Sequence, residues 1–170
     1  MYSNGTEVKI VTQNVFGDGN HESTQLVLDA LYQSDPKDRV VLDIGTGTGV
    51  QAIYAKKWGA KDVLAVDIEY RAIITARDNF KRNNVKIKSR LNIYNEYLHT
   101  KADITVANLP APGIREFLKI AKSTMKEDGV LICSFPTQFN FANECDLSEY
   151  EIVNQINGIE YNAYTLRSKK

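Results

Sequence analysis

The feature that most constrains this chain is an apolar run that leads into alternating glycines. Residues 40–44 are apolar apart from Asp43, and glycine follows at Gly45, Gly47 and Gly49. Glycine adopts left-handed backbone conformations without strain and lets the chain approach a ligand closely. A helix that begins near Val50 would add the unpaired N–H groups of its first turn. The pattern therefore predicts a strand, a tight turn and a helix arranged around a small ligand.

Short apolar runs recur along the chain and alternate with stretches of helical spacing. Runs with few polar breaks are typical of strands that are covered on both faces. They occupy residues 40–44, 63–66, 104–107 and 130–135. The helical stretches between them are residues 50–58, 70–83 and 114–125. This alternation predicts an α/β fold with a doubly wound, mostly parallel sheet, whose ligands bind beyond the carboxyl ends of the strands.

Two further elements flank this core. Residues 22–31 have the spacing of a helix, and Asn20 or Ser23 can cap it. Near the C-terminus, residues 150–156 and 159–166 are rich in β-forming side chains and flank the turn pair Asn157-Gly158. We therefore expect an antiparallel C-terminal hairpin that completes the sheet.

Length and composition favour one domain. The chain has 170 residues with 21 acidic and 21 basic side chains, so its overall charge gives no argument for a nucleic-acid or membrane partner. We expect a single domain over residues 1–170, with residues 1–15 as an N-terminal extension and no separate substrate-recognition domain.

Cys133 and Cys145 lack the spacing of zinc ligands, so we expect no metal site. No signal peptide or membrane-spanning run is apparent, and a cytoplasmic location is the default. The oligomeric state is not indicated.

A second acidic residue extends the predicted ligand site. Asp67 ends the second strand, where a carboxylate can accept both hydroxyls of a ribose, and Ile68 can pack against adenine. The alternative is an aspartate that caps the helix beginning at Tyr70. A dinucleotide site such as one for NAD also stays open, because Gly47 and Ala52 approach the GxGxxG spacing. Together, the two strand ends predict a ligand that contains a nucleoside.

These residues resemble those of class I methyltransferases that depend on S-adenosylmethionine (SAM), through DxGxGxG at residues 43–49 and the acidic strand end. The chain is most similar to the catalytic domain of the PrmA family, bacterial enzymes that methylate lysines and the amino terminus of a ribosomal protein. Residues 16–24 are similar to that family's FGTGTHPTT. Residues 67–77 match as well, and residues 108–111 are NLPA where the family usually has NILA.

The resemblance implies a Rossmann-like methyltransferase fold and a set of cofactor-binding residues. SAM would be bound by Phe16, Gly17, Thr24, Asp43, Gly45, Thr46, Gly47, Gly49, Asp67, Ile68 and Asn108. His21 matches too, but a lone histidine more commonly makes local hydrogen bonds.

Asn108 is also the expected catalytic residue. Its side chain and a following backbone carbonyl can orient a nitrogen lone pair toward the methyl group for in-line displacement. The alternative is a strand-to-helix loop stiffened by Pro110 and Pro112.

The predicted activity is N-methylation of a protein, at a lysine or amino terminus like those of a ribosomal protein. RNA or small-molecule N-methylation and a non-catalytic SAM-binding or nucleotide-binding module remain alternatives. We interpret one basic stretch as a solvated helix end and loop: Lys81, Arg82, Lys86, Lys88 and Arg90. We expect no function for the residues that follow it: Tyr94, Tyr97 and His99.

Overall fold

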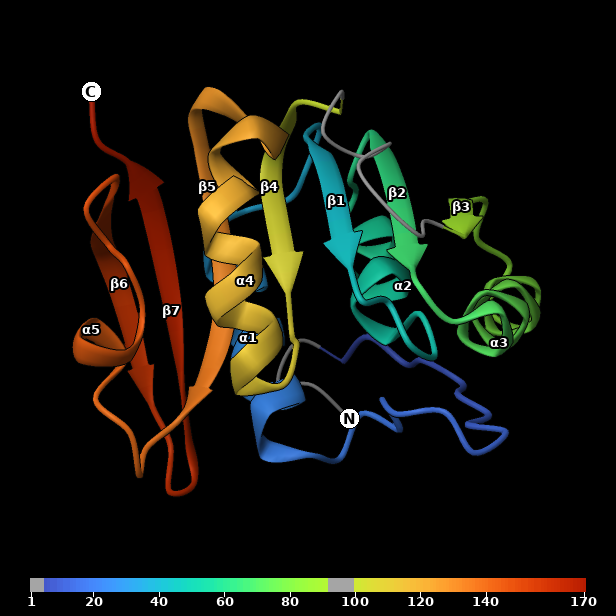
Figure 1. Ribbon diagram of the computed structural model, residues 1–170. Helices are drawn as coiled ribbons and strands as arrows, with labels where there is room; N and C mark the ends of the chain where they lie inside the picture. Colours follow the sequence, from blue (N-terminus) through green and yellow to red (C-terminus); the bar gives the residue numbers. More distant parts are fainter. Residues whose placement is uncertain (1–4, 92–99) are drawn as a thin grey trace.

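A seven-stranded sheet forms the centre of the protein (Figure 1). The computed structural model describes residues 5–91 and 100–170. The strands follow the order β3-β2-β1-β4-β5-β7-β6. Neighbours from β3 to β5 run parallel, whereas β7 is antiparallel to both β5 and β6. The predicted α/β fold, with a mostly parallel sheet and an antiparallel C-terminal hairpin, is therefore confirmed.

Among the described elements, strands and helices alternate from α1 to β3 and from β4 to β5, whereas β3, which was not predicted, precedes β4 with no described helix between them. The strands are β1 (Val40–Ile44), β2 (Asp62–Asp67), β3 (Lys88–Leu91), β4 (Ala102–Ala107), β5 (Met125–Pro136), β6 (Tyr150–Asn157) and β7 (Tyr161–Ser168). The helices are α1 (Glu22–Gln33), α2 (Val50–Lys57), α3 (Tyr70–Arg82), α4 (Ala111–Ala121) and α5 (Phe141–Glu144), with a 3-10 turn, η2 (Lys122–Thr124).

Helices cover both faces of the sheet. In Figure 1, α1 and α2 lie behind it, and they pack with Phe80 of α3 on an apolar cluster that contains Leu28 and Ile53. α4 lies in front, and it packs with α5 on a second cluster around Leu42 and Phe135. Because the central strands are buried on both sides, their sequences are nearly continuous apolar runs.

The helix predicted over residues 114–125 is wrong at both ends. α4 begins earlier, because Pro110 is its N-cap and Pro112 lies in its first turn, where a missing N–H needs no helical partner. The helix also ends earlier, since η2 follows it and Met125 is already the first residue of β5.

The interpretation of the basic stretch is wrong in part. Lys81 and Arg82 close α3 as expected for a helix end, but Lys88–Leu91 forms the edge strand β3, paired with β2. This strand is largely exposed and carries mostly polar side chains, so it lacks the apolar run of a central strand. The residues for which we expect no function lie outside the described part of the chain: Tyr94, Tyr97 and His99.

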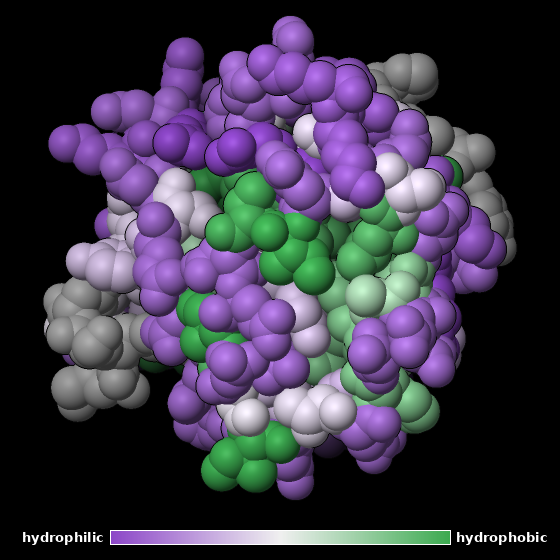
Figure 2. Space-filling view, turned by 90° about the vertical axis from the view of Figure 1, so that its left-hand side faces the viewer, coloured by the Kyte–Doolittle hydropathy of each residue, from purple (hydrophilic) through white to green (hydrophobic). Residues whose placement is uncertain are grey.

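The C-terminal hairpin turns later than predicted. Asn157 pairs with Asn162, so Ile159 lies in the turn instead of a strand and is 88% exposed. β6 is the other edge of the sheet, and its pairing shifts between Ile152 and Asn154, as at a β-bulge. Figure 2 shows the side of the molecule that β6 forms, on which apolar side chains gather among polar ones.

The first turn of α1 differs from the prediction in its capping residue. His21, not Asn20 or Ser23, is the N-cap: its Nδ1 accepts from the Ser23 backbone N–H at 3.3 Å and lies 2.8 Å from the Ser23 hydroxyl. The local hydrogen-bonding role expected for this lone histidine is therefore confirmed.

Two asparagines of α3 hold the N-terminal segment against the helix. Asn79 accepts from the Val11 N–H and donates to the Val11 carbonyl, both at 2.9 Å. Asn83 makes the same pair of bonds with Lys9, at 2.9 and 2.7 Å. The segment is thus tied along α3 on its way to the glycine loop.

Among the described helices, none is long and apolar enough to cross a membrane.

Candidate functional site

The carboxyl ends of β1, β2 and β4 meet at one edge of the sheet. The glycine loop leaves β1 there with positive φ values of 68° at Gly45, 54° at Gly47 and 84° at Gly49. A Cβ atom at Gly45 would run into the Leu109 side chain, and one at Gly47 would stand 2.5 Å from the Phe16 carbonyl oxygen. The alternating glycines are therefore required both by backbone conformation and by space.

Asp67 joins the second strand to this loop. Its Oδ2 accepts from the Gly47 N–H and its Oδ1 from the Glu69 N–H, both at 2.9 Å. The alternative role as a helix cap does not hold, because the N-cap of α3 is Glu69. Ile68, the next residue, is 74% exposed. A carboxylate and an apolar side chain thus stand beside the loop.

Asp43 is buried beneath the loop. Its Oδ2 accepts from the Thr46 hydroxyl at 2.6 Å, whereas Oδ1 has no hydrogen-bond partner among the described residues. Burial is the main cause that raises the pKa of the Asp43 carboxyl to about 7, with the nearby Asp67 acting in the same direction and the Thr46 hydroxyl and the Ala52 N–H acting against it. An incompletely satisfied carboxyl group therefore lies under the site.

The N-terminal segment forms another wall of the site. The Thr48 N–H donates to the Phe16 carbonyl at 3.1 Å, and the Thr48 hydroxyl donates to the carbonyl of Gly17. On the other side of the loop, the Asn79 amide donates to the Thr48 carbonyl at 3.0 Å. Sequence reasoning missed Asn79, whose signal is an amide side chain on the buried and mostly apolar side of α3.

Asn108 follows β4 and lies between two hydroxyl groups. Its Nδ2 donates to Thr24 Oγ1 of α1 at 3.3 Å, and its Oδ1 accepts from Ser134 Oγ of β5 at 2.7 Å. Thr24 and Asn108 were both predicted, and the structure brings them together. Ser134 was missed, although a hydroxyl within the apolar run of β5 is a signal that could have identified it.

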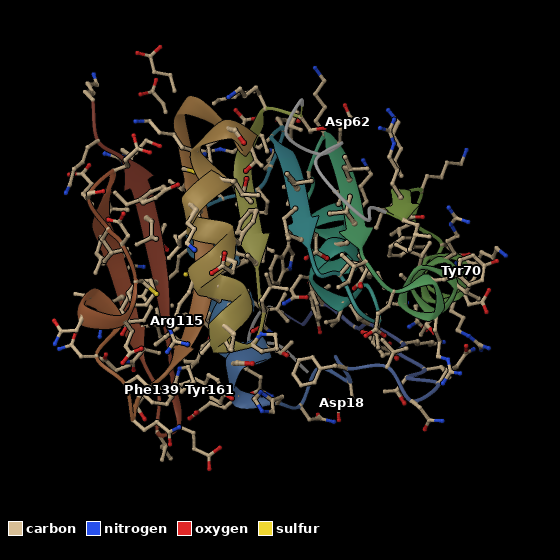
Figure 3. All side chains as sticks on the ribbon, in the orientation of Figure 1. Asp18, Asp62, Tyr70, Arg115, Phe139 and Tyr161 are labelled. Carbon is tan, nitrogen blue, oxygen red and sulfur yellow. The ribbon has the colours of Figure 1, made fainter. Side chains whose placement is uncertain are left out.

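Aromatic rings and charged groups border this edge. The His21 ring makes edge contacts with Phe16 and with Tyr161, each at 5.2 Å between ring centroids. Figure 3 shows Tyr161 at the same end of the sheet as Asp18, with Asp62 at the opposite end. The structure thus brings aromatic rings from both ends of the chain, Phe16 and Tyr161, into contact with His21.

The hairpin turn is tied to the start of α1 by Glu22. The carboxylate accepts from three successive backbone N–H groups, those of residues 159, 160 and 161, at 2.7, 2.7 and 2.8 Å. These bonds lower the pKa of the Glu22 carboxyl, the Ile159 N–H having the largest effect. Sequence reasoning missed this link, because it joins segments far apart along the chain.

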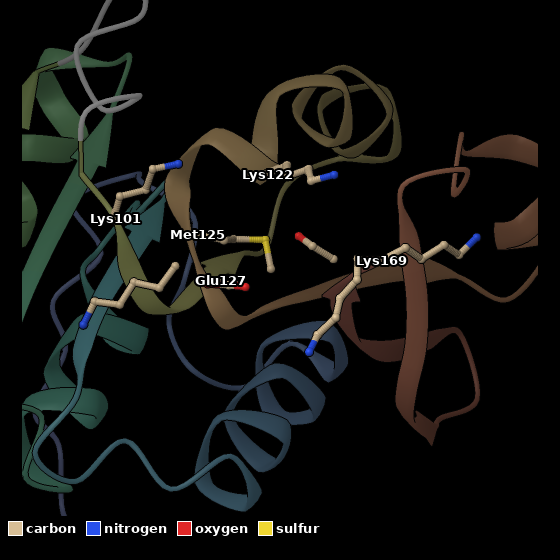
Figure 4. A pocket seen from close by; sticks show the side chains of 8 residues that line it. Lys101, Lys122, Met125, Glu127 and Lys169 are labelled. Atoms are coloured by element: carbon tan, nitrogen blue, oxygen red, sulfur yellow. The ribbon is translucent and has the colours of Figure 1, made fainter.

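A hollow lies at the end of the sheet where β4 and β5 begin (Figure 4). This cavity of about 610 Å³ contains none of the predicted site residues; it is lined by Lys101, Lys122, Met125, Lys126, Glu127, Ser168, Lys169 and Lys170. Lys122 and Lys126 are paired with Glu149 and Asp103, at 2.9 and 2.8 Å.

In the described ranges, no three histidine, cysteine or acidic side chains gather as metal ligands, and both cysteines are buried.

Comparison with known proteins identifies the family. A family model described as ribosomal protein L11 methyltransferase (PrmA) matches residues 7–135. The ribosomal protein L11 methyltransferase of Caldicellulosiruptor saccharolyticus is 43% identical over 129 residues, 76% of this chain and 43% of that protein. That of Pasteurella multocida is 34% identical over 144 residues, 84% of this chain and 49% of that protein. The chain thus spans about half the length of these curated relatives.

Solved structures agree with this assignment. The ribosomal protein L11 methylase of Lactobacillus delbrueckii subsp. bulgaricus superimposes with a TM-score of 0.81 at 29% identity, covering 92% of this chain and 82% of that one. The Thermus thermophilus 16S rRNA N2 G1207 methyltransferase shares the fold, with a TM-score of 0.78 at 20% identity over 91% of this chain and 45% of that one. The resemblance found in the motifs is confirmed: the chain belongs to the PrmA family of ribosomal protein L11 methyltransferases.

Proposed function

We propose that this protein uses SAM to methylate a nitrogen of a ribosomal protein, at a lysine or an amino terminus. Family membership supports the reaction class, and the names of the curated relatives support the acceptor. The observation that carries the proposal is Asn108, which lies within hydrogen-bond distance of Thr24 at the edge where the glycine loop leaves the sheet. A single functional domain and a cytoplasmic location are parts of the same proposal.

The donor set of the site fits SAM. The glycine loop has positive φ values at Gly45 and Gly47, packs closely on Leu109 and Phe16, and is bonded to Asp67. Asp67 would accept the ribose hydroxyls beside it, and the exposed Ile68 would cover the adenine ring. The carboxyl groups of Asp43 and Asp67 favour a cationic ligand over a pyrophosphate. The other residues proposed to hold the cofactor are Phe16, Gly17, Thr24, Thr46, Gly49 and Asn108.

Catalysis by this site is proposed to consist of alignment and desolvation. When bound, the sulfonium of SAM supplies an activated methyl group. Asn108 would hold the acceptor nitrogen so that its lone pair points along the line of displacement. The partners of Asn108 are hydroxyls rather than titratable groups, so its surroundings favour orientation over proton transfer. A lysine acceptor must react uncharged, and burial of the amine on binding would favour the neutral form.

Calorimetry with variants of the two aspartates of β2 tests the cofactor site. Asp67→Ala removes a ribose acceptor and should weaken SAM binding by about 10- to 100-fold, the range of a hydrogen bond to a charged group. Asp62→Ala, at the exposed opposite end of the same strand, is the matched control and should leave the affinity unchanged. Equal affinities for the two variants would refute the ribose assignment.

A transfer assay tests the reaction and its acceptor. Incubation with methyl-labelled SAM and a ribosomal fraction should place label in a protein. Asn108→Ala should reduce transfer to a trace, with a smaller loss of SAM affinity than Asp67→Ala. Label in RNA or in a small amine would replace the proposed acceptor, whereas tight SAM binding without transfer to any fraction would favour a binding module. Stronger thermal stabilisation by NAD than by SAM at equal concentration would refute the assignment of SAM as the cofactor.

A further inference from the structure

Ser134 lies beside Asn108 because of the register of β4 and β5. These parallel strands pair Ala107 with Cys133, so the next residues along the two strands are Asn108 and Ser134. Ser134 is 2% exposed, and its side chain alternates away from those of Cys133 and Phe135, toward the face covered by α1. The Ser134 hydroxyl thereby lies within hydrogen-bond distance of the Asn108 side chain.

The three polar groups form one directed chain of hydrogen bonds. Ser134 Oγ donates to Asn108 Oδ1 at 2.7 Å, and Asn108 Nδ2 donates to Thr24 Oγ1 at 3.3 Å. Both hydroxyl-bearing residues are buried, whereas Asn108 is partly exposed. Both bonds join neutral groups. The bond from Ser134 has the usual length of an O–H···O bond, whereas the 3.3 Å bond to Thr24 is longer than usual for N–H···O, so Ser134 is the stronger partner of the amide.

This chain leaves defined groups of Asn108 available for a ligand. A side-chain amide has two acceptor lone pairs and two N–H donors. Ser134 uses one lone pair, and Thr24 uses one N–H. One lone pair on Oδ1 and one N–H on Nδ2 remain, and the Thr24 hydroxyl keeps its own hydrogen to donate.

We propose that Ser134 is a positioning residue that holds the side chain of Asn108 in place, so that the free Oδ1 lone pair receives an N–H of the acceptor amine. This inference rests on the proposed methyltransferase function. An amine held by one of its own N–H groups directs its lone pair elsewhere, which suits attack on a methyl carbon. Ser134 touches neither acceptor nor cofactor and acts only through Asn108.

A double-mutant cycle tests this dependence. Ser134→Ala should lower kcat by about 10- to 100-fold, the effect of a small misplacement of reacting groups, with a much smaller change in SAM affinity. In an Asn108→Ala background, which lacks the amide that Ser134 holds, the same change should have little further effect on the transfer that remains. Equal losses of kcat in both backgrounds would show that Ser134 does not act through Asn108.

Thr105→Val is the matched control for the loss of a buried hydroxyl. Thr105 lies on β4 and its hydroxyl contacts that of Thr124 at 3.3 Å, away from Asn108. This variant should lower the stability without changing kcat. A loss of kcat equal to that of Ser134→Ala would indicate a general effect of sheet destabilisation and would overturn the proposal.

A spectroscopic readout separates this inference from the proposed function. In the free protein, Ser134→Ala should shift the side-chain amide NMR signals of Asn108 and speed their exchange with water, whether or not an acceptor is found. Thr105→Val should leave these signals in place. Thr24→Val, at the other end of the chain, provides a second variant should Ser134→Ala fail to fold. Unchanged Asn108 signals in both variants would refute the hydrogen-bond chain itself.

Discussion

The carboxylate of Asp67 accepts a hydrogen bond from the backbone N–H of Gly47 at 2.9 Å. This bond fastens the acidic end of β2 to the glycine loop at the end of β1, so the two motifs that the sequence places 20 residues apart form one structure. The same carboxylate is proposed to bind the ribose, and its position is thus set before any ligand arrives. Such preorganisation lowers the ordering cost of binding.

We expect Gly45→Ala to impair both stability and SAM binding. The substitution combines a positive φ, which costs an L-residue about 1–2 kcal/mol, with a clash against the Leu109 side chain. Gly5→Ala is the control, because Gly5 has a similar φ of 75° but open space around its Cβ position. Urea unfolding should give a lower free energy of unfolding for Gly45→Ala than for Gly5→Ala. Calorimetry should find weaker SAM binding only for Gly45→Ala. Similar behaviour of the two variants would mean that Leu109 simply moves aside.

The Asp43 carboxyl should make the protein less stable as the pH rises from 5 to 7. Its pKa of about 7 in the folded state lies above the ordinary value of 3.8, so in this window the folded state holds a proton that the unfolded state has lost. The free energy of unfolding then falls by up to about 1.4 kcal/mol per pH unit. Asp43→Asn should lack this contribution. Denaturant unfolding at pH 5, 6 and 7 measures the free energy of unfolding of both proteins. The same pH dependence in both would contradict the prediction.

Asn79 should matter more for cofactor binding than Asn83. Both side chains hold the N-terminal segment by paired bonds, but only Asn79 also holds the Thr48 carbonyl of the glycine loop. Asn79→Ala should cost about 3 kcal/mol of stability, because it leaves several buried backbone groups unpaired. It should also weaken SAM binding clearly more than Asn83→Ala does, as measured by calorimetry. Equal affinities would indicate that the loop keeps its conformation without this bond.

Glu22 should control the opening of the hairpin turn. Glu22→Ala removes the acceptor of three backbone N–H groups, so hydrogen exchange at residues 159–161 should become faster than in the native protein. Glu116→Ala, which removes an exposed carboxylate of α4 paired with Lys119, serves as the control. Unchanged exchange in Glu22→Ala would show that the turn is held by its own backbone bonds.

The parts of the fold that were predicted correctly are those with a local signal. β1, β2, β4 and β5 are recognisable because burial on both faces requires continuous apolar runs. β3 lacks that signal because it is an exposed edge, and the start of α4 depends on how Pro110 and Pro112 fit a helix start. Thr24 and Asn108 were predicted from motifs. Ser134 becomes informative only when the register of β4 and β5 sets it beside Asn108, 26 residues away along the chain.

The N-terminal segment has a consequence for the order of folding. Lys9 and Val11 are synthesised before their partners Asn83 and Asn79, which lie 74 and 68 residues further along the chain. Contacts of such long range pay the entropy of closing a long loop before they stabilise the fold. Lys9 and Val11 are therefore expected to acquire these native contacts only once α3 has formed.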